Sequence, residues 1–299
     1  MQPKVSVIIS NRNNADLLKK SLGNLDEIRN KYYQNLEVLV VDNRSHDDSV
    51  NMIEDRFPWV HVLKSENKGL AAANNLGAKH ATGDYLIFLG ADGYPRIDTI
   101  GKLVEYMQEH PEVGIASPRL SLQGGEPDKD ASRSFPTPWN SFTKLTGLYK
   151  LFPKSNLFGS YFKRFDDIHN PYETDACVTG FMLIPSSLYA KIGGFDQDYF
   201  AYGEDLDICY RMKQAGYKVM YLPHLESGHL KTRLNEKKAS LSDKLTMAHS
   251  STKAMRLFLK KNYKKKYSSA LLAFMTLGTF ALQAHRVSGV FLKHLFSRK

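Results

Sequence analysis

The chain has 299 residues, 42% of them hydrophobic and 24% charged, which is typical of a globular protein with one large domain or a domain and an appendage. Its two cysteines, Cys177 and Cys209, are too few for a disulfide framework or a cysteine zinc site, so we expect reduced, buried thiols. The net charge of +10 is uneven: residues 1–230 carry 25 Lys and Arg against 29 Asp and Glu, and residues 231–299 carry 16 against 2. A slightly acidic domain with a basic tail is therefore predicted.

Apolar strands alternate with amphipathic helices in the first 120 residues. Runs of mainly apolar and β-branched residues predict strands at Val5–Ile9, Glu37–Val41, Val60–Leu63, Tyr85–Leu89 and Val113–Ser117. Helical spacing of apolar residues predicts helices at Ala15–Arg29, Ser49–Phe57, Leu70–His80 and Ile97–His110. This alternation predicts an α/β protein with a Rossmann-like, mixed, mostly parallel sheet and helices on both faces. Because Val5–Ile9 is too short for the core of a signal peptide, we expect the domain to stay in the cytoplasm.

The segment 119–175 has weak secondary-structure signals. It contains chain breakers such as Gly124-Gly125 and Pro136-Thr137-Pro138. A segment of this length inside an α/β domain is usually functional, often as a substrate loop or lid. After it, strands are predicted at Val178–Pro185 and Lys218–Leu222, with a helix at Asp207–Ala215.

Polar residues follow several of the predicted strands. They lie at 10–13, 42–45, 66–67 and at Asp92. Ligands of open, mostly parallel sheets bind beyond the carboxyl ends of the strands. A single Asp after a strand is more often a turn residue, but several strands ending in this way favour a ligand site.

The run from Gly194 to Asp207 places the adjacent acids Glu204 and Asp205 beside Phe and Tyr residues. Desolvation raises the pKa of a carboxyl group and suits it to act as a base near neutral pH. Acids are also favourable at a helix N-terminus, so Glu204, Asp205 and Asp207 have a second interpretation as caps of the helix that follows. Both interpretations remain open on the residues alone.

These motifs together resemble glycosyltransferase family 2, whose fold is called GT-A. The resemblance covers about residues 4–230 and rests on the order of Val5–Ile9, Val40–Ser45, Asn67–Gly77, Gly83–Leu89, Thr179-Gly180, Gly193–Asp196 and Glu204–Asp207. Three further stretches, Arg119-Leu120, Ser134–Pro138 and Tyr202–Cys209, are similar to the rhamnosyltransferase-like branch, whose members build bacterial surface polysaccharides or lipid-linked oligosaccharides. The resemblance implies an inverting enzyme that moves a sugar, with rhamnose as the leading choice, from a nucleotide-diphosphate donor to a glycan or lipid-linked acceptor.

The resemblance also implies a role for each part of the site. The residues expected to bind the nucleotide and donor are Asn11, Arg12, Asp42, Asn67, Gly69, Asn74 and Asp92, and those on the acceptor side are Thr179, Gly180, Gly194 and Phe195. Asp205 is expected to be the base that takes the proton of the acceptor hydroxyl, with Glu204 supporting acceptor orientation. Residues 1–230 would form the GT-A catalytic domain, in which 119–175 is the acceptor or lid region.

A divalent metal, Mn²⁺ or Mg²⁺, is implied at Asp92. The family commonly has Asp-x-Asp there, whereas this chain has Gly90-Ala91-Asp92 with a single carboxylate. The rhamnosyltransferase-like branch often has a single carboxylate as well. His229 matches a histidine that is a second ligand in some relatives, and Mn²⁺ suits a His and Asp pair better than Mg²⁺. The single carboxylate leaves an alternative open, a non-catalytic sugar-nucleotide-binding or membrane scaffold protein of the same fold. A nucleotidyltransferase is disfavoured because Ser10–Asn14 is not a glycine- and basic-rich phosphate loop.

The tail, residues 231–299, combines lysines at 253–267 with an apolar run, Ala270–Ala284, that is shorter than the roughly 20 residues needed to span a bilayer. This combination favours peripheral attachment to the anionic inner face of the cytoplasmic membrane. The alternative is a helix packed back on the catalytic domain. Nucleic-acid binding is disfavoured because the lysines accompany no recognition motif. Nothing in the sequence predicts the oligomeric state.

Overall fold

The computed structural model describes residues 2–152, 155, 157–158, 161, 169–230 and 241–296. Its main sheet is built from β1 (Val5–Asn11), β2 (Leu36–Asp42), β3 (His61–Lys64), β4 (Tyr85–Gly90), β5 (Gly93–Pro95), β6 (Val113–Ser121), β8 (Tyr172–Glu173), β10 (Phe181–Pro185) and β11 (Lys218–His229). The strand order is β3-β2-β1-β4-β10-β6-β11-β5, with β8 beside β11. Two short strands, β7 (Ser132–Arg133) and β9 (Ala176–Cys177), pair with each other beside it.

The main sheet is mixed and mostly parallel, as predicted. Strands β1 to β4 run parallel, β10 runs antiparallel between β4 and β6, and β6 is parallel to β11. The central strands are apolar without alternation because both faces of the sheet are covered. In β1, Val5, Val7 and Ile9 enter the core on one face, whereas Ile8 enters the core on the other.

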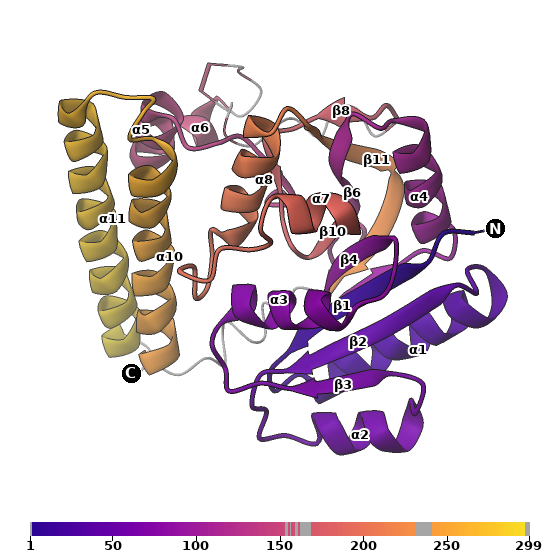
Figure 1. The fold of residues 1–299 in the computed structure, drawn as a ribbon. Coiled ribbons are helices and arrows are strands. Elements are labelled where there is room, and N and C mark those ends of the chain that lie inside the picture. The colour runs from indigo at the N-terminus through magenta and orange to yellow at the C-terminus, as the bar shows by residue number, and fades with distance from the viewer. Residues whose placement is uncertain are drawn as a thin grey trace.

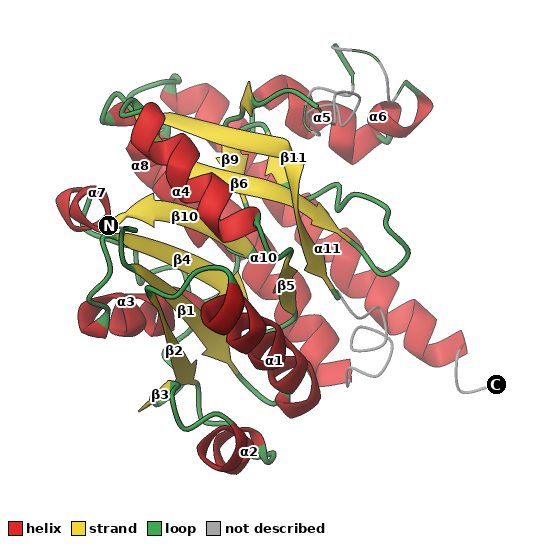
Figure 2. Ribbon diagram, turned by 90° about the vertical axis from the view of Figure 1, so that its right-hand side faces the viewer, coloured by secondary structure: helices red, strands yellow, loops and turns green. Residues whose placement is uncertain are grey.

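The helices that cover the sheet follow the same division. One face carries α1 (Ala15–Lys31) and α4 (Thr99–Glu109), and the other carries α3 (Leu70–His80), α7 (Ser186–Lys191) and α8 (Glu204–Gln214) (Figures 1 and 2). The short helix α2 (Ser49–Arg56) packs beside α1. The predicted helices of the first half are all present, with ends shifted by a few residues.

The second half differs from the prediction in several places. Helix α8 begins at Glu204 rather than Asp207, because Gly203 has a φ of 85° and starts the helix there. Strand β11 continues past an irregularity between Leu222 and Glu226 to His229, seven residues beyond the predicted end. The strand β5 and the helix α7 were not predicted, since both are short.

The predicted irregular segment contains two helices, α5 (Pro138–Thr146) and α6 (Leu148–Leu151). Pro138, interpreted as a breaker, lies in the first turn of α5, where a missing amide costs nothing. Thr137 and Asn140 form a capping box there. Parts of the predicted lid region (153–154, 156, 159–160 and 162–168) and of the tail (231–240 and 297–299) lie outside the described residues.

The tail forms two neighbouring helices, α10 (Leu241–Asn262) and α11 (Ser269–Phe296), which lie side by side at the left of Figure 1. Phe258 of α10 and Tyr263, the residue after α10, are buried in a cluster with Tyr199, next to Tyr210 of α8. Helix α10 therefore packs on the α/β domain, as in the alternative that the sequence left open. In the described ranges, no helix is both long and apolar enough to cross a membrane.

The packing of α10 predicts that it belongs to the cooperative folding unit. Phe258 is 1% exposed and Phe274 on α11 is 71% exposed. We expect Phe258→Ala to lower the free energy of unfolding by about 3–5 kcal/mol, because it leaves a cavity, and Phe274→Ala to change it by less than about 0.5 kcal/mol. Urea denaturation followed by circular dichroism measures both. Equal, small effects would show that α10 is not part of that unit.

Candidate active site

The predicted site residues converge because several strands end at one edge of the sheet. In the parallel pair β1 and β2, Asn11 lies opposite Asp42. The amide of Gly90 at the end of β4 donates to the carbonyl of Gly180 just before β10, at 3.1 Å. The last residue of β11, His229, pairs with Gly93 of β5, next to Asp92. The pairing of these strands thus brings together residues that are far apart in the sequence.

At the predicted nucleotide end of the site, hydrogen bonds hold the carboxylate of Asp42 in place. Asp42 is buried, and its side chain accepts hydrogen bonds from the amide and hydroxyl of Ser45 at 3.0 and 2.5 Å. Asn11, also buried, donates to Asp42 at 3.3 Å. Arg12 is exposed beside them. These contacts hold Asp42 in one orientation and leave the charged Arg12 free to reach a ligand.

The predicted diphosphate side lies at the start of α3. Gly69 has a φ of 96°, and a Cβ there would lie 2.4 Å from the carbonyl oxygen of Phe200. The same oxygen accepts the amide of Leu70 at 3.0 Å. Only glycine fits this close approach. Asn67 also has a left-handed backbone, with a φ of 54°, and Asn74 is buried within α3.

The predicted metal end is a chain of three side chains. His229 Nε2 lies 3.5 Å from Asp92 Oδ2, and His229 Nδ1 lies 3.0 Å from Oδ2 of the buried Asp128. A histidine that binds a metal usually gives its other ring nitrogen to a carboxylate, which fixes the ring. Asp128 therefore orients His229 so that Nε2 faces Asp92.

This donor set fits a divalent ion with two protein ligands. The three residues cannot all bind one ion, because Asp128 contacts the opposite ring nitrogen; in the described part of the chain no group of three or more His, Cys, Asp or Glu is arranged to hold a metal. At Gly90 a Cβ would lie 2.7 Å from Asp92 Oδ1, so the Asp92 carboxylate folds toward the place where the family's other Asp would begin. An imidazole and one carboxylate suit Mn²⁺, whose remaining ligands would come from a diphosphate and water.

The acidic pair occupies the first turn of α8. Burial, and then the charge of Asp205, raise the pKa of Glu204 to about 8. Glu204 Oε1 accepts from Thr179 Oγ1 at 3.2 Å, and its Oε2 is buried without a hydrogen-bond partner among the described residues. Asp205 instead forms an ion pair with Arg133 of β7 and accepts the Leu206 amide at 2.7 Å. One carboxyl is therefore held neutral at pH 7 and its neighbour has a cation beside it.

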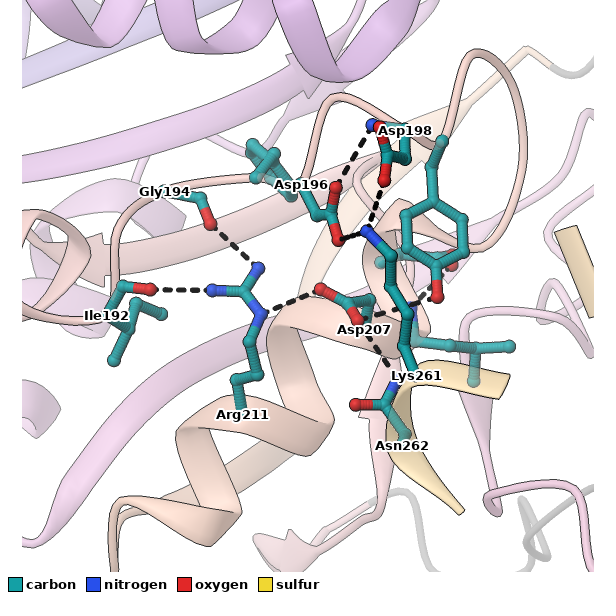
Figure 3. Close-up of polar contacts among 12 residues, drawn as sticks. Ile192, Gly194, Asp196, Asp198, Asp207, Arg211, Lys261 and Asn262 are labelled. Atoms are coloured by element: carbon teal, nitrogen blue, oxygen red, sulfur yellow. Dashed lines mark hydrogen bonds and ion pairs between the residues drawn. The ribbon is translucent and has the colours of Figure 1, made fainter. Parts of the chain in front are cut away.

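Asp207 has a structural role and is not part of this pair. It accepts from Arg211 Nε at 2.7 Å and from Asn262 Nδ2 at 2.9 Å (Figure 3). Arg211 also donates to the carbonyls of Ile192 and Gly194, each at 2.7 Å. Asp207 lies in the first turn of α8 without capping its backbone amides. Its contacts join α8 to α10, and Arg211 extends them to the turn before the acidic run.

The loop 195–203 is anchored from α10 as well. Lys261 Nζ lies 2.5 Å from a carboxylate oxygen of both Asp196 and Asp198 (Figure 3). Because Phe200 in the same loop contacts Gly69 and Leu70, this loop joins the diphosphate side to the acidic pair. Lys261 and Asn262 of the tail therefore help to fix the geometry of the site.

The predicted acceptor-side residues divide into two kinds. Thr179 contacts Glu204, and a Cβ at Gly180 would lie 3.6 Å from the His229 ring. Phe195 requires a correction: its ring is buried in the core against Phe88 and Tyr189, so it does not line an acceptor surface. Gly194 has a φ of 68°, and a Cβ there would lie 2.8 Å from Asn75 Oδ1, so its role is to form a tight turn.

Sequence reasoning missed Asp128 and Arg133. Both lie in the segment predicted as irregular, where no hydrophobic periodicity places a residue relative to the sheet. Their signal in the sequence was weak, because a buried Asp128 and a half-buried Arg133 look like any other charged residues of an irregular segment. Their partners His229 and Asp205 are 101 and 72 residues away in sequence, so only the three-dimensional structure brings them together.

Two family models match the chain. Residues 6–179 match Glycosyl transferase family 2. Residues 159–235 match a model described as the N-terminal domain of galactosyltransferase. The first match runs from β1 to just before β10, which includes the nucleotide end of the site and Asp92 but not His229.

Curated relatives and solved structures agree with these matches. The rhamnosyltransferase WbbL of Escherichia coli K12 is 26% identical over 237 residues, covering 75% of this chain and 83% of the relative. The pre-mycofactocin glycosyltransferase of Mycobacterium tuberculosis is 29% identical over 227 residues, 73% of this chain but only 41% of that longer relative.

The fold is shared with two solved glycosyltransferases. The mannosyltransferase PcManGT of Pyrobaculum calidifontis, solved with GDP-Man and Mn²⁺, has a TM-score of 0.59 at 19% identity, covering 98% of this chain and 76% of that one. GalNAc-T7, solved with UDP, GalNAc and Mn²⁺, has a TM-score of 0.62 at 19% identity, covering 86% of this chain and 48% of that one. The predicted GT-A fold is thereby confirmed.

The contact between Asp128 and His229 predicts that Asp128 contributes to metal affinity. We expect Asp128→Asn to weaken Mn²⁺ binding in the presence of a nucleoside diphosphate by about 10- to 100-fold, because the ring of His229 loses its fixed orientation. Electron paramagnetic resonance of free Mn²⁺ measures this affinity. Asp98→Asn, at an exposed ion pair with Lys102, is the control and should bind as the wild type does. Unchanged affinity in Asp128→Asn would contradict the orienting role.

The raised pKa of Glu204 predicts a pH-dependent stability. The unfolded carboxyl ionises near pH 4.5 and the folded one near 8. Between these values the folded state holds a proton that the unfolded state has lost, so this contribution to stability is complete below pH 4.5 and is lost as pH rises through 8, at up to about 1.4 kcal/mol per pH unit.

Glu204→Gln should remove this slope, so the variant gains stability relative to the wild type as pH rises from 5 to 8. Urea denaturation at several pH values measures the difference. Glu66→Gln, at a side chain 84% exposed, should stay parallel to the wild type. A constant difference between Glu204→Gln and the wild type would show that Glu204 is not held protonated.

Proposed function

The chain belongs to glycosyltransferase family 2, and we propose that it is an inverting enzyme that moves a sugar from a nucleotide diphosphate to a polysaccharide or lipid-linked oligosaccharide of the bacterial cell surface. The single observation that carries this proposal is the convergence of Asp42, the Asp92–His229 pair and the Glu204–Asp205 pair at one edge of the sheet. Asp42 would bind the base of the nucleotide, the Asp92–His229 pair would hold a metal ion at the diphosphate, and the Glu204–Asp205 pair would act on the acceptor hydroxyl.

Rhamnose is the proposed sugar. The similarity to a rhamnosyltransferase supports it, at 26% identity, and the stretches that resemble that branch of the family point the same way. A thymidine diphosphate donor is the corresponding proposal. The related solved proteins contain UDP or GDP-Man, so uridine and guanosine donors are the alternatives to compare.

Asp92 and His229 are the residues that would hold a divalent ion at the diphosphate. When bound, such an ion neutralises the negative charge that builds up on the departing nucleoside diphosphate. Arg12, exposed next to the nucleotide end, would add a positive charge there. Asn11 and Ser45 hold Asp42 in the orientation that accepts hydrogen bonds from the base.

Asp205 is the proposed base and Glu204 the group that orients the acceptor. Single displacement inverts the anomeric carbon and requires a carboxylate to take the proton of the attacking hydroxyl. Arg133 forms a direct ion pair with Asp205 and places a positive charge beside it. Glu204, with a pKa of about 8, carries its proton at pH 7 and donates a hydrogen bond to the acceptor from the oxygen that is otherwise unpaired. Thr179 holds the other oxygen in place.

We also propose that the enzyme works in the cytoplasm, attached peripherally to the inner face of the cytoplasmic membrane. Residues 231–299 contain 16 basic and 2 acidic residues. This positive charge supports the location, because the inner leaflet is anionic. A lipid-linked acceptor would be presented at the same surface.

The proposal predicts release of nucleoside diphosphate from one member of a panel of dTDP-rhamnose, UDP-sugars and GDP-sugars. We expect turnover with Mn²⁺, loss of turnover with EDTA, and a fall of about 10²- to 10⁴-fold in kcat for Asp205→Asn. Glu105→Gln, on the outer surface of α4, is the control. Full activity in Asp205→Asn would show that Asp205 is not the base. Nucleotide binding by calorimetry without turnover of any donor would favour a non-catalytic scaffold.

The roles of the two acids also predict a pH profile. Because Glu204 must be protonated, we expect kcat/KM to fall as pH rises through about 8, and Glu204→Gln, which keeps a hydrogen-bond donor, to lose this fall. An increase in the wild-type rate through pH 8 would instead make Glu204 the base and exchange the two roles.

A further inference from the structure

Helix α11 presents an apolar face to solvent. Four of its large side chains are unusually exposed: Phe274 at 71%, Leu277 at 66%, Phe280 at 52% and Phe291 at 47%. Exposed alanines at 270, 273, 281 and 284 complete the stripe. The first three large residues are spaced three apart, so they lie along one side of the helix. The stripe from 270 to 291 is about 33 Å long at 1.5 Å per residue.

The opposite side of α11 is already occupied. Met275 and Thr279 are buried toward α10, and the Thr252 hydroxyl of α10 donates to Gln283 at 3.1 Å. The two helices lie along each other for most of their length (Figure 1). The outer apolar face is therefore not the face that stabilises the fold, and a contiguous apolar patch of this kind marks an interaction surface.

The charges around this face identify the chemistry of its partner. Residues 269–296 contain no Asp or Glu. Exposed Lys264, Lys265 and Lys266 lie in the turn that leads into α11. Arg256 of α10 lies over the Phe280 ring, 4.3 Å from its centroid, and so borders the stripe directly. An apolar face with a cationic border fits a partner that has an apolar interior beneath an anionic surface layer.

A second copy of this chain fits less well. Pairing two α11 stripes about a twofold axis would bring the cationic borders of two basic tails together, with no acidic residue on either α11 to offset the repulsion. An anionic bilayer meets both requirements, since its acyl region takes the apolar side chains and its headgroups take the cations.

We propose that α11 lies flat in the headgroup region of an anionic membrane, with Phe274, Leu277 and Phe280 inserted and Arg256 and Lys264–Lys266 at the phosphates. Helix α10 lies between α11 and the site, and Lys261 and Asn262 of α10 contact the loop and helix that carry the acidic pair. Docking through α11 thus sets a fixed distance between the membrane and the acceptor side of the site. This inference rests on the peripheral attachment proposed above and assigns it to one face of one helix. Because this surface binds without a sugar donor, it is tested apart from the transfer reaction.

Flotation of the full chain with vesicles of phosphatidylglycerol and phosphatidylcholine, or of phosphatidylcholine alone, tests the surface. We expect binding to the anionic vesicles and at least tenfold weaker binding to the neutral ones. Binding should weaken as salt is raised to 0.5 M, because salt screens the attraction between the lysines and the anionic headgroups. The double substitution Phe274→Glu with Leu277→Glu should reduce binding to anionic vesicles by at least tenfold. Tyr32→Glu, at a side chain 47% exposed beyond the end of α1, is the matched control and should bind as the wild type does.

Circular dichroism confirms that the double variant is folded, and release of nucleoside diphosphate from a soluble donor is measured on the same samples. Unchanged vesicle binding by the double variant would overturn the proposal, as would a wild type that does not bind anionic vesicles. Light scattering that shows a dimer in the wild type and a monomer in the double variant would identify a second copy as the occupant and also overturn it. Absence of donor turnover in the wild type, with its vesicle binding intact, would count against the transfer function alone.

Discussion

The alignment of strand ends in the main sheet is the constraint on which the site depends. The register that pairs Asn11 with Asp42, and the hydrogen bond from Gly90 to Gly180, place the ends of β1, β2 and β4 beside the start of β10. Side chains alternate between faces along a strand, so a shift of one residue would turn each functional group to the wrong side. Burial of β1 on both faces, with Val7 and Ile8 in opposite cores, fixes this register strongly.

A second element, the loop 195–203, connects the start of α3 with the acidic pair at the start of α8. On one side its Phe200 carbonyl touches Gly69 and Leu70, and on the other side Gly203 begins α8 and its acidic pair. The ion pairs of Lys261 with Asp196 and Asp198 fasten the loop to α10 (Figure 3). We therefore expect a change in the tail to alter both the proposed donor side and the proposed acceptor side, in addition to the membrane attachment that we propose for it.

The sequence was sufficient for the fold of the first half and for placing most of the candidate site residues near the strand ends. Buried parallel strands have a strong local signature, and the residues at their ends, such as Asp42 and Asp92, follow from it directly. The missing parts depend on contacts between distant segments. Asp128 and Arg133 come from an irregular region and acquire their roles only through His229 and Asp205. Phe195 was placed on the acceptor side because its neighbours in sequence belong to a motif, but packing against Phe88 buries its ring.

The central claim is that Asp42 and the Asp92–His229 pair hold opposite ends of one nucleoside diphosphate. Calorimetric titration of dTDP, UDP and GDP, with Mn²⁺ and then with EDTA, tests it most directly on the wild type, Asp42→Ala and Asp92→Ala. We expect one nucleotide to bind with a 1:1 stoichiometry, with affinity reduced at least tenfold by either substitution, and Asp92→Ala to be insensitive to EDTA. Binding that neither substitution weakens, or no binding of any of the three nucleotides, would contradict the account.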